Sequence, residues 1–284
     1  MNFMKAFNDT IDYLESVLDN QIEEKKVLYI SGYSYPMFSR LFSILTNTSL
    51  SEYLRGRRLS EAAVLLRETD KKVIDIASLY GYESPNSFGT AFKNFHGVTP
   101  SEVRSGKPFK VISRVQLVLT VQGGRNMNIT IQKKDAFVVA GLDEQSIDSS
   151  VCPQVWKKLY NTYSHDELAK LGDGKSVGVC HDIDEPNTLN YLAGYVIKDS
   201  MTAKDMGLDI LEVQAAEYAI VELMGKVPEC IHEGWKYVME VFFPEQGYVH
   251  SGSPDFEYYY EGDMQSDNYK MELWIPIVKK NEEL

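Results

Sequence analysis

Two segments of this chain repeat one design: GYSYPMFSRLF at residues 32–42 and GYESPNSFGTAF at residues 81–92. Each begins with Gly-Tyr, continues through a Ser and a Pro, and ends in aromatic residues at helical spacing. Gly favours the end of a helix, Ser caps the start of the next, and Pro suits its first turn. The design therefore predicts a helix, a tight turn and a second amphipathic helix, twice over.

The residues between these segments predict a long helix that joins the two pairs. In SLSEYLRGRRLSEAAVLLRE (49–68) the apolar residues recur at helical spacing, and several Arg are expected to stay outside. Further upstream, NDTIDYLESVLDNQI also has helical spacing, with Asn8 or Asp9 as a candidate cap. We interpret this third of the chain as two helix-turn-helix units, each of which can place its second helix in a DNA major groove. A small helical bundle would bury the same apolar residues and is the alternative.

The net charge of the whole chain argues against DNA binding. The net charge is −12, but residues 25–72 hold 9 Lys or Arg against 4 Asp or Glu. Binding to phosphate depends on the charge that faces it, and not on the total. The acidic total is carried by the remainder of the chain, so the first third stays a candidate DNA-binding region.

Residues 73–104, VIDIASLYGYESPNSFGTAFKNFHGVTPSEVR, resemble the signature of the AraC/XylS family of transcription regulators. The resemblance extends over about residues 8–106 and includes the first helix pair and the helix that follows it. It implies a domain that reads double-stranded promoter DNA and is able to do so as a monomer, with RNA polymerase as a further partner.

The second helix of each pair is expected to expose the side chains that contact DNA. Arg40 suits a phosphate or a guanine edge, Asn86 suits adenine, and Lys93 suits a phosphate. The complete set of predicted DNA contacts is Tyr35, Pro36, Ser39, Arg40, Asn86, Ser87, Thr90 and Lys93.

After SGKPFK (105–110), which we interpret as a linker, the pattern changes to strands. SRVQLVLTVQGG and MNITIQKKDAFVVAGL alternate, CPQVWKKLYNTY predicts a helix, and two strands follow around an Asp-Glu-Pro-Asn turn. The order recurs from LDILEVQAAEYAIVELMG, with CIHEGWKYVMEVFF as the second helix. A duplicated strand–helix–strand–strand unit predicts an α+β domain with an antiparallel sheet and a cleft between its halves.

This second part resembles the GyrI-like effector-binding domain, through AFVVAGL, VGVCHDIDEP, AAEYAIVEL, GWKYVMEVFFPEQGY, PDFEYYYEG and MELWIPI. The resemblance implies a small-molecule effector that is often cationic or aromatic. We therefore expect a multidomain chain: an all-α DNA-binding domain at 1–106, a linker or strand at 107–128, and an α+β domain at 129–280.

Strand parity suggests where the effector binds. In YKMELWIPI, Glu272 and Trp274 share one face, and a carboxylate in a largely apolar strand that faces the cleft would favour a cation. The alternative is that Glu272 pairs with a Lys at an exposed edge. The predicted ligand-binding residues are Glu272, Trp274, Tyr191, Trp235, Tyr237, Phe256 and Tyr258.

Other classes of function find little support in the sequence. His181 stands beside Cys180 without a further His or Cys at ligand spacing, and phosphate-binding Gly loops and GxSxG are missing, so we expect no metal and no cofactor. The three cysteines are widely spaced, and no apolar run suits a membrane span, so we expect a cytoplasmic regulator and not an enzyme. The rival hypotheses are a GyrI-like hydrolase, with Glu272 and Tyr258 in its pocket, and a protein that sequesters toxic small molecules.

Overall fold

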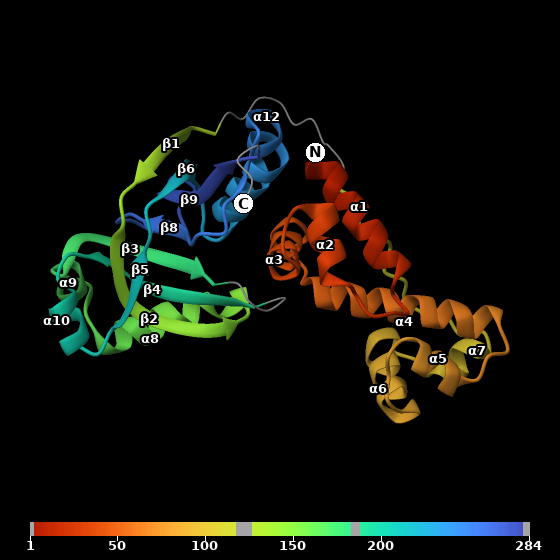
Figure 1. Ribbon diagram of the computed structural model, residues 1–284. Coiled ribbons are helices and arrows are strands. Elements are labelled where there is room, and N and C mark those ends of the chain that lie inside the picture. Colours follow the sequence, from red (N-terminus) through yellow and green to blue (C-terminus); the bar gives the residue numbers. More distant parts are fainter. Residues whose placement is uncertain (1–2, 118–126, 183–187, 281–284) are drawn as a thin grey trace. The chain divides into compact units, whose positions relative to one another are not determined.

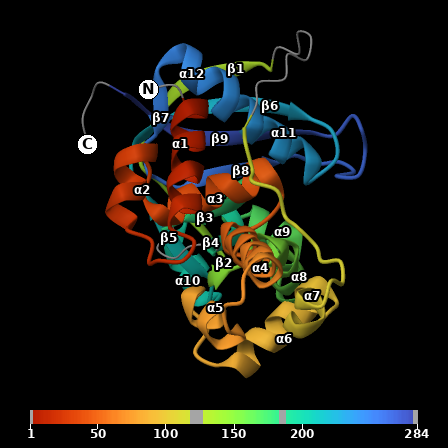
Figure 2. The ribbon, with the colours of Figure 1, turned by 90° about the vertical axis from the view of Figure 1, so that its right-hand side faces the viewer.

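The computed structural model describes residues 3–117, 127–182 and 188–280 (Figures 1 and 2). The chain forms two compact units, residues 1–119 and 120–284, and each is described by itself. Among the helices described, none combines the length and the apolar character that crossing a membrane requires.

The regular secondary structure described in the first unit is all helical, as predicted (Figure 1). Its helices are α1 (Phe3–Ser16), α2 (Glu24–Ser31), α3 (Tyr35–Thr46), α4 (Leu50–Glu68), α5 (Val73–Leu79), α6 (Pro85–His96) and α7 (Pro100–Arg104). Helices α2–α3 and α5–α6 form the two helix-turn-helix pairs, and α4 joins them. Gly32 ends α2 with φ 79° and Gly81 follows α5 with φ 78°, a left-handed conformation that Gly adopts without a Cβ clash.

Aromatic residues form the core of both halves of this unit. Phe7 of α1 stacks on Phe42 of α3, with ring centroids 6.0 Å apart, and both side chains are fully buried. Phe88 and Phe92 of α6 lie 5.4 Å apart in the second core, against apolar residues of α4, α5 and α7. Burial of a Phe contributes about 1.5–3 kcal/mol, so each helix pair has an apolar anchor of its own.

Residues 107–117, which we call the strap, follow α7 and run along α4 towards α1 (Figure 2). Asn8 donates to the carbonyl of Leu117 at 2.9 Å and accepts from its amide at 2.8 Å. The sequence offered Asn8 as a candidate cap of the first helix. That expectation is wrong, because α1 already begins at Phe3 and Asn8 lies within it. The backbone of the strap also bonds three side chains of α4, namely Tyr53, Arg57 and Ser60.

Gly56 lies in the middle of α4, where Gly costs a helix about 1 kcal/mol relative to Ala. The strap explains it. A Cβ on Gly56 would lie 2.3 Å from Cδ1 of Ile112, so the isoleucine side chain occupies the space that any other residue would need. The missing side chain allows the strap to pack directly on the helix backbone.

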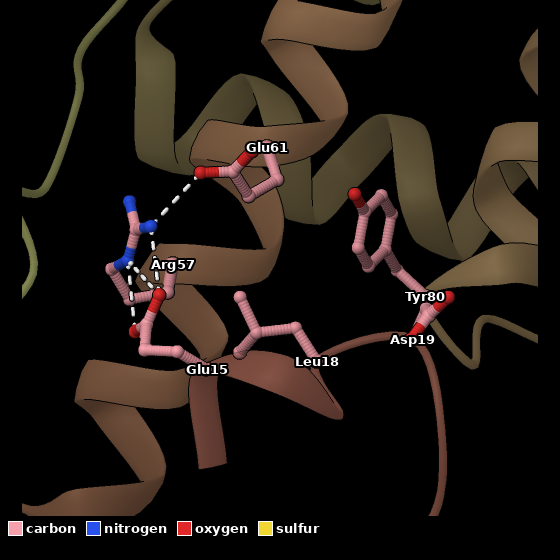
Figure 3. Close-up of a pocket in the computed structure, with 6 residues that line it drawn as sticks. All are labelled: Glu15, Leu18, Asp19, Arg57, Glu61 and Tyr80. Atoms are coloured by element: carbon pink, nitrogen blue, oxygen red, sulfur yellow. Dashed lines mark hydrogen bonds and ion pairs between the residues drawn. The ribbon is translucent and has the colours of Figure 1, made fainter. Parts of the chain in front are cut away.

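A polar cavity of about 280 Å³ lies where the C-terminal end of α1 meets α4 and α5 (Figure 3). Arg57 lies between two carboxylates there: it pairs with Glu15 at 2.8 Å and with Glu61 at 2.9 Å. Tyr80 faces the cavity, and its pKa is raised to about 12, first by burial and then by Glu61 and Asp19. The pair with Glu15 ties α1 to α4, the helix that joins the two helix-turn-helix units, while the pair with Glu61 lies within α4.

The second unit contains nine strands within its described residues. They are β1 (Ile129–Lys134), β2 (Phe137–Ile147), β3 (Gly172–His181), β4 (Leu189–Ile197), β5 (Asp209–Val213), β6 (Ala216–Met224), β7 (Tyr248–His250), β8 (Asp255–Tyr259) and β9 (Lys270–Lys279). The helices are η1 (Ser149–Val151), α8 (Cys152–Thr162), α9 (His165–Ala169), α10 (Ser200–Asp205), α11 (Glu229–Tyr237), the π-helix η2 (Val238–Phe242) and α12 (Phe243–Gln246).

The strands form one antiparallel sheet in the order β1-β6-β9-β8-β3-β4-β2-β5 (Figure 1). Strand β7, labelled in Figure 2, pairs with β9. The predicted repeat is present as β2-α8-β3-β4 and β6-α11-β8-β9. Two residues separate β1 from β2, and two separate β5 from β6. Because β1 pairs with β6 and β2 pairs with β5, a long two-stranded ribbon joins the two halves of the sheet.

The two faces of the sheet have different roles. Helices α8, α9 and α10 cover the outer face of one half, and α11 packs on β6 in the other. The opposite face, which we call the inner face, carries its own buried cluster: Val139, Val177, Val179, Leu192, Val213, Tyr218, Ile220, Phe256, Tyr258 and Trp274. Side chains from both halves thus pack together where the sequence repeat had predicted a cleft.

Two expected features lie outside the described residues. The predicted Asp-Glu-Pro-Asn turn is one of them. The other is most of the strand expected over SRVQLVLTVQGG (113–124). The described residues of that stretch, 113–117, belong to the strap and form no strand.

Candidate functional site

The second helix of each helix-turn-helix pair starts as the sequence predicted. Ser34 accepts a hydrogen bond from the amide of Met37 at 3.3 Å, and Pro36 lies in the first turn of α3. Ser84 accepts from the amide of Ser87 at 3.1 Å, and Pro85 begins α6. These caps satisfy amides that the helix itself leaves without partners.

Helix α6 has the exposed polar face that DNA contact requires. Asn86, Thr90 and Lys93 are exposed at successive turns, while Phe88 and Phe92 are buried on the other side. Ser87 is exposed as well, but its hydroxyl donates to the carbonyl of Ser84 at 2.8 Å and so takes part in the cap. The predicted exposure of these side chains is confirmed, and we call Asn86, Thr90 and Lys93 the α6 stripe.

Helix α3 departs from the prediction. Ser39 is 0% exposed and Arg40 is 9% exposed, although both were expected to be open to solvent. Tyr35 and Pro36 are half-buried. Burial of α3 is not confined to one face. The six consecutive residues 37–42 are all buried, and at about 100° per residue they extend round more than a full turn of the helix.

In the second unit, four of the predicted ligand residues come together on the inner face and its rim. Tyr258 stacks on Trp274 with ring centroids 4.1 Å apart and an angle of 27°. Phe256 lies edge-on to Trp274 at 6.3 Å. The indole Nε1 of Trp274 donates to Oε2 of Glu272 at 2.7 Å, so the expected parity of these two residues is confirmed.

Glu272 lies in the interior of the sheet, because β9 is flanked by β6 and β8. It therefore does not sit at an exposed edge. Its other oxygen accepts from the hydroxyl of Tyr260 at 2.6 Å, and Glu222 stands directly opposite on β6. Within the described part of the chain, no Lys or Arg forms an ion pair with Glu272.

Burial and nearby carboxylates act on the tyrosines around Glu272. Burial is the largest cause that raises the pKa of Tyr258, and Asp173 and Glu272 add to it. The pKa of Tyr260 is also raised, by burial and by its hydrogen bond to Glu272. Both hydroxyls therefore stay protonated at neutral pH and can donate hydrogen bonds. A cavity of about 420 Å³, lined by Tyr260, Glu261, Asp263 and Tyr269 among others, opens beside this region.

The other three predicted ligand residues lie elsewhere. Tyr191 is on the outer face, where it accepts from Nε1 of Trp156 at 2.9 Å. Trp235 and Tyr237 belong to α11, and Trp235 stacks against His250 at 6.1 Å. Aromatic character alone could not tell the two faces of the sheet apart.

Glu257 was missed by the sequence interpretation. It is half-buried on β8, and its Oε2 accepts from Tyr191 at 3.0 Å and from Tyr259 at 2.6 Å. Trp156 lies edge-on to Tyr259 at 5.5 Å. A signal was present, because Glu257 interrupts the aromatic strand DFEYY just as Glu272 interrupts MELWIPI. The domain thus has two carboxylates set among aromatic rings, one on each face.

The described residues contain no group of three or more His, Cys, Asp or Glu side chains suited to a metal ion. His181 instead contacts Asp143 at 3.0 Å and Asp182 at 3.1 Å. These carboxylates raise its pKa, against the lowering effect of burial.

Comparison with known proteins assigns both units. Residues 127–278 match the model of the GyrI-like small molecule binding domain, and residues 30–106 match a helix-turn-helix domain. The chain is 36% identical over 104 residues to the regulatory protein SoxS of Escherichia coli (strain K12), covering 37% of this chain and 97% of SoxS.

The chain is also 36% identical over 105 residues to the uncharacterized HTH-type transcriptional regulator YbfP of Bacillus subtilis (strain 168). The match covers 37% of this chain and only 36% of YbfP. Among solved structures, SAV2435 bound to tetraphenylphosphonium aligns with a TM-score of 0.46 and 20% identity, over 54% of this chain and 94% of that one.

Proposed function

Because this chain belongs to the AraC-type helix-turn-helix regulators and carries a GyrI-like small molecule binding domain, we propose that it regulates transcription in response to an organic cation. The N-terminal unit binds promoter DNA, and the C-terminal unit binds the effector. The observation that carries the choice of effector is the Glu272 carboxylate beside the stacked pair of Tyr258 and Trp274.

The chemistry of this group favours a cation. Glu222 and Glu272 face each other across β6 and β9, and like charges directly opposite in a sheet destabilise each other. A bound cation would relieve that repulsion. The aromatic faces add cation–π attraction of about 2 kcal/mol where water is excluded. A neutral aromatic ligand would gain the stacking and leave the charge repulsion in place.

DNA binding by an acidic chain is consistent with the distribution of its charge. The α6 stripe presents an amide, a hydroxyl and an ammonium group from one exposed helix face. Asn and Lys in these positions suit a base edge and a phosphate respectively. The ligand-binding unit carries the acidic excess, which suits a cationic effector and does not have to face DNA.

The variant Glu272→Gln tests the effector site. It keeps the shape and one hydrogen-bond acceptor but removes the charge. We expect its affinity for tetraphenylphosphonium, used as a rigid aromatic cation, to fall by about 1.5–3 kcal/mol in calorimetry. The matched control is Glu257→Gln, which removes the carboxylate on the other face. Unchanged affinity in Glu272→Gln with a loss in Glu257→Gln would move the site to the outer face.

Incubating the protein with the same cation also distinguishes binding of the ligand from its chemical turnover. Mass spectrometry after incubation is expected to recover the cation and any ester-bearing analogue intact. Accumulation of a hydrolysis product that depends on Glu272 would favour the hydrolase hypothesis instead.

A further inference from the structure

Lys134, at the end of β1, lies over the ring of Trp274. Its ammonium nitrogen is 4.3 Å from the ring centroid, and it donates to Oε1 of Gln132 at 2.8 Å. Lys134 is half-buried, whereas its neighbour Lys133 is exposed and points to the other side of the strand. The chain thus places a cation of its own on the aromatic ring that belongs to the proposed effector site.

The indole of Trp274 is occupied on both faces and at its polar edge. Tyr258 is stacked 4.1 Å away, so one face is covered by a ring. Two groups this close to the centroid cannot share a face, and the ammonium of Lys134 therefore takes the other. The Nε1 edge is bonded to Glu272. A cation that binds beside Glu272, on the face of the indole opposite Tyr258, must take the position of Lys134.

We propose that Lys134 is an internal competitor that occupies the cation position in the absence of effector and must be displaced for the effector to bind. The inference rests on the proposed function, because it assumes that the effector uses Trp274 and Glu272. Displacement is feasible because Lys134 is near the end of its strand and its flexible stem can carry the ammonium into water.

Such a competitor selects the chemical class of the effector. An ammonium group is compact and strongly hydrated, so a small ammonium ligand offers the site nothing that Lys134 does not already supply. A larger cation with delocalised charge and apolar surface loses less hydration and gains more contact with the rings. Lys134 therefore lowers the affinity of the site for simple amines and favours the binding of lipophilic aromatic cations.

The test compares three substitutions in the full chain, with tetraphenylphosphonium as the probe and calorimetry as the measurement. Lys134→Met keeps an apolar stem and removes the charge, and we expect the affinity to rise about tenfold, the order of a partly desolvated cation–π contact. Lys134→Arg keeps a cation on the ring and is expected to stay near the wild-type affinity. Lys133→Met removes the same charge from the neighbouring position and controls for the change in net charge.

The outcomes separate this inference from the function on which it rests. Equal affinities of Lys134→Met and Lys133→Met for the probe would overturn the proposal that Lys134 competes with the effector. In that case, binding by the wild type that is lost in Glu272→Gln would still support the effector site. A lower affinity in Lys134→Met would also overturn it, because Lys134 would then be a ligand contact. Failure of the wild type and of every variant to bind the probe would overturn both proposals.

Discussion

Helices α3 and α6 start from the same sequence pattern, a Ser cap followed by Pro, and each buries aromatic residues against α4 or its neighbours. Their polar residues differ in environment. Asn86, Thr90 and Lys93 of α6 are exposed, whereas Ser39 and Arg40 of α3 are buried. A local pattern thus determines the helix and its cap, while the exposure of the helix's polar face depends on what packs around it.

The largest effect is expected at the α6 stripe. Asn86→Ala removes an amide that suits an adenine edge, so affinity for duplex DNA from upstream of the coding sequence should fall by about 1–3 kcal/mol. Fluorescence anisotropy with the full chain measures it. The control is Asn20→Ala, which removes an exposed amide between α1 and α2. Equal losses of DNA affinity in the two variants would show that the α6 stripe contributes no more to DNA binding than another exposed amide does.

The helix between the two pairs offers the next test, through Gly56 and Ile112. Gly56→Ala places a Cβ in the space of Ile112 and should destabilise the chain by about 1–3 kcal/mol. In the background of Ile112→Ala the clash is gone, and the same change should stabilise the helix by about 0.5–1 kcal/mol. Chemical denaturation of the four chains measures the reversal of sign. The same sign in both backgrounds would mean that the strap does not pack on α4 as described.

The smallest effect concerns pH and the second helix pair alone. His96 of α6 is buried, and burial lowers its pKa below the ordinary value of 6.5. The unfolded chain therefore binds a proton at a higher pH than the folded chain, and stability falls as the pH drops below about 6.5. The stability is fully present above that value.

Hydrogen exchange at the amides of α3 and α6 can locate this acid effect. Helices α1–α3 contain no His, so protection in α6 should weaken with acid more than protection in α3. His96→Gln, which keeps a donor for the carbonyl of Leu59, should remove the difference. Equal weakening of both helices in the wild type would show that the pH dependence arises elsewhere.

Local signals predicted a large part of this fold. The caps Ser34 and Ser84 and the duplicated strand–helix–strand–strand unit were readable because they depend on neighbours in sequence. The shared face of Glu272 and Trp274 was readable for the same reason, since alternation in a strand is a local property.

What could not be predicted depends on residues far apart in the chain. The burial of Arg40, the contact of Gly56 with Ile112 and the position of Lys134 on Trp274 all arise from tertiary packing. Glu257 was missed for a related reason, because Tyr191, one of the two tyrosines that donate to it, lies on another strand 66 residues away. The sequence thus predicted the elements and their faces, but not which faces would be covered.

The comparison of α3 with α6 is tested most directly by the salt dependence of DNA binding in Lys93→Ala and Arg40→Ala. Each substitution removes one positive charge, and Lys198→Ala, exposed in the other unit, controls for net charge. In a plot of the logarithm of DNA affinity against the logarithm of salt concentration, the magnitude of the slope reports how many phosphates the protein neutralises. Loss of one phosphate contact reduces that magnitude by about one. We predict that Lys93→Ala loses this amount and that Arg40→Ala keeps the wild-type slope. A loss in Arg40→Ala with an unchanged slope in Lys93→Ala would contradict the account.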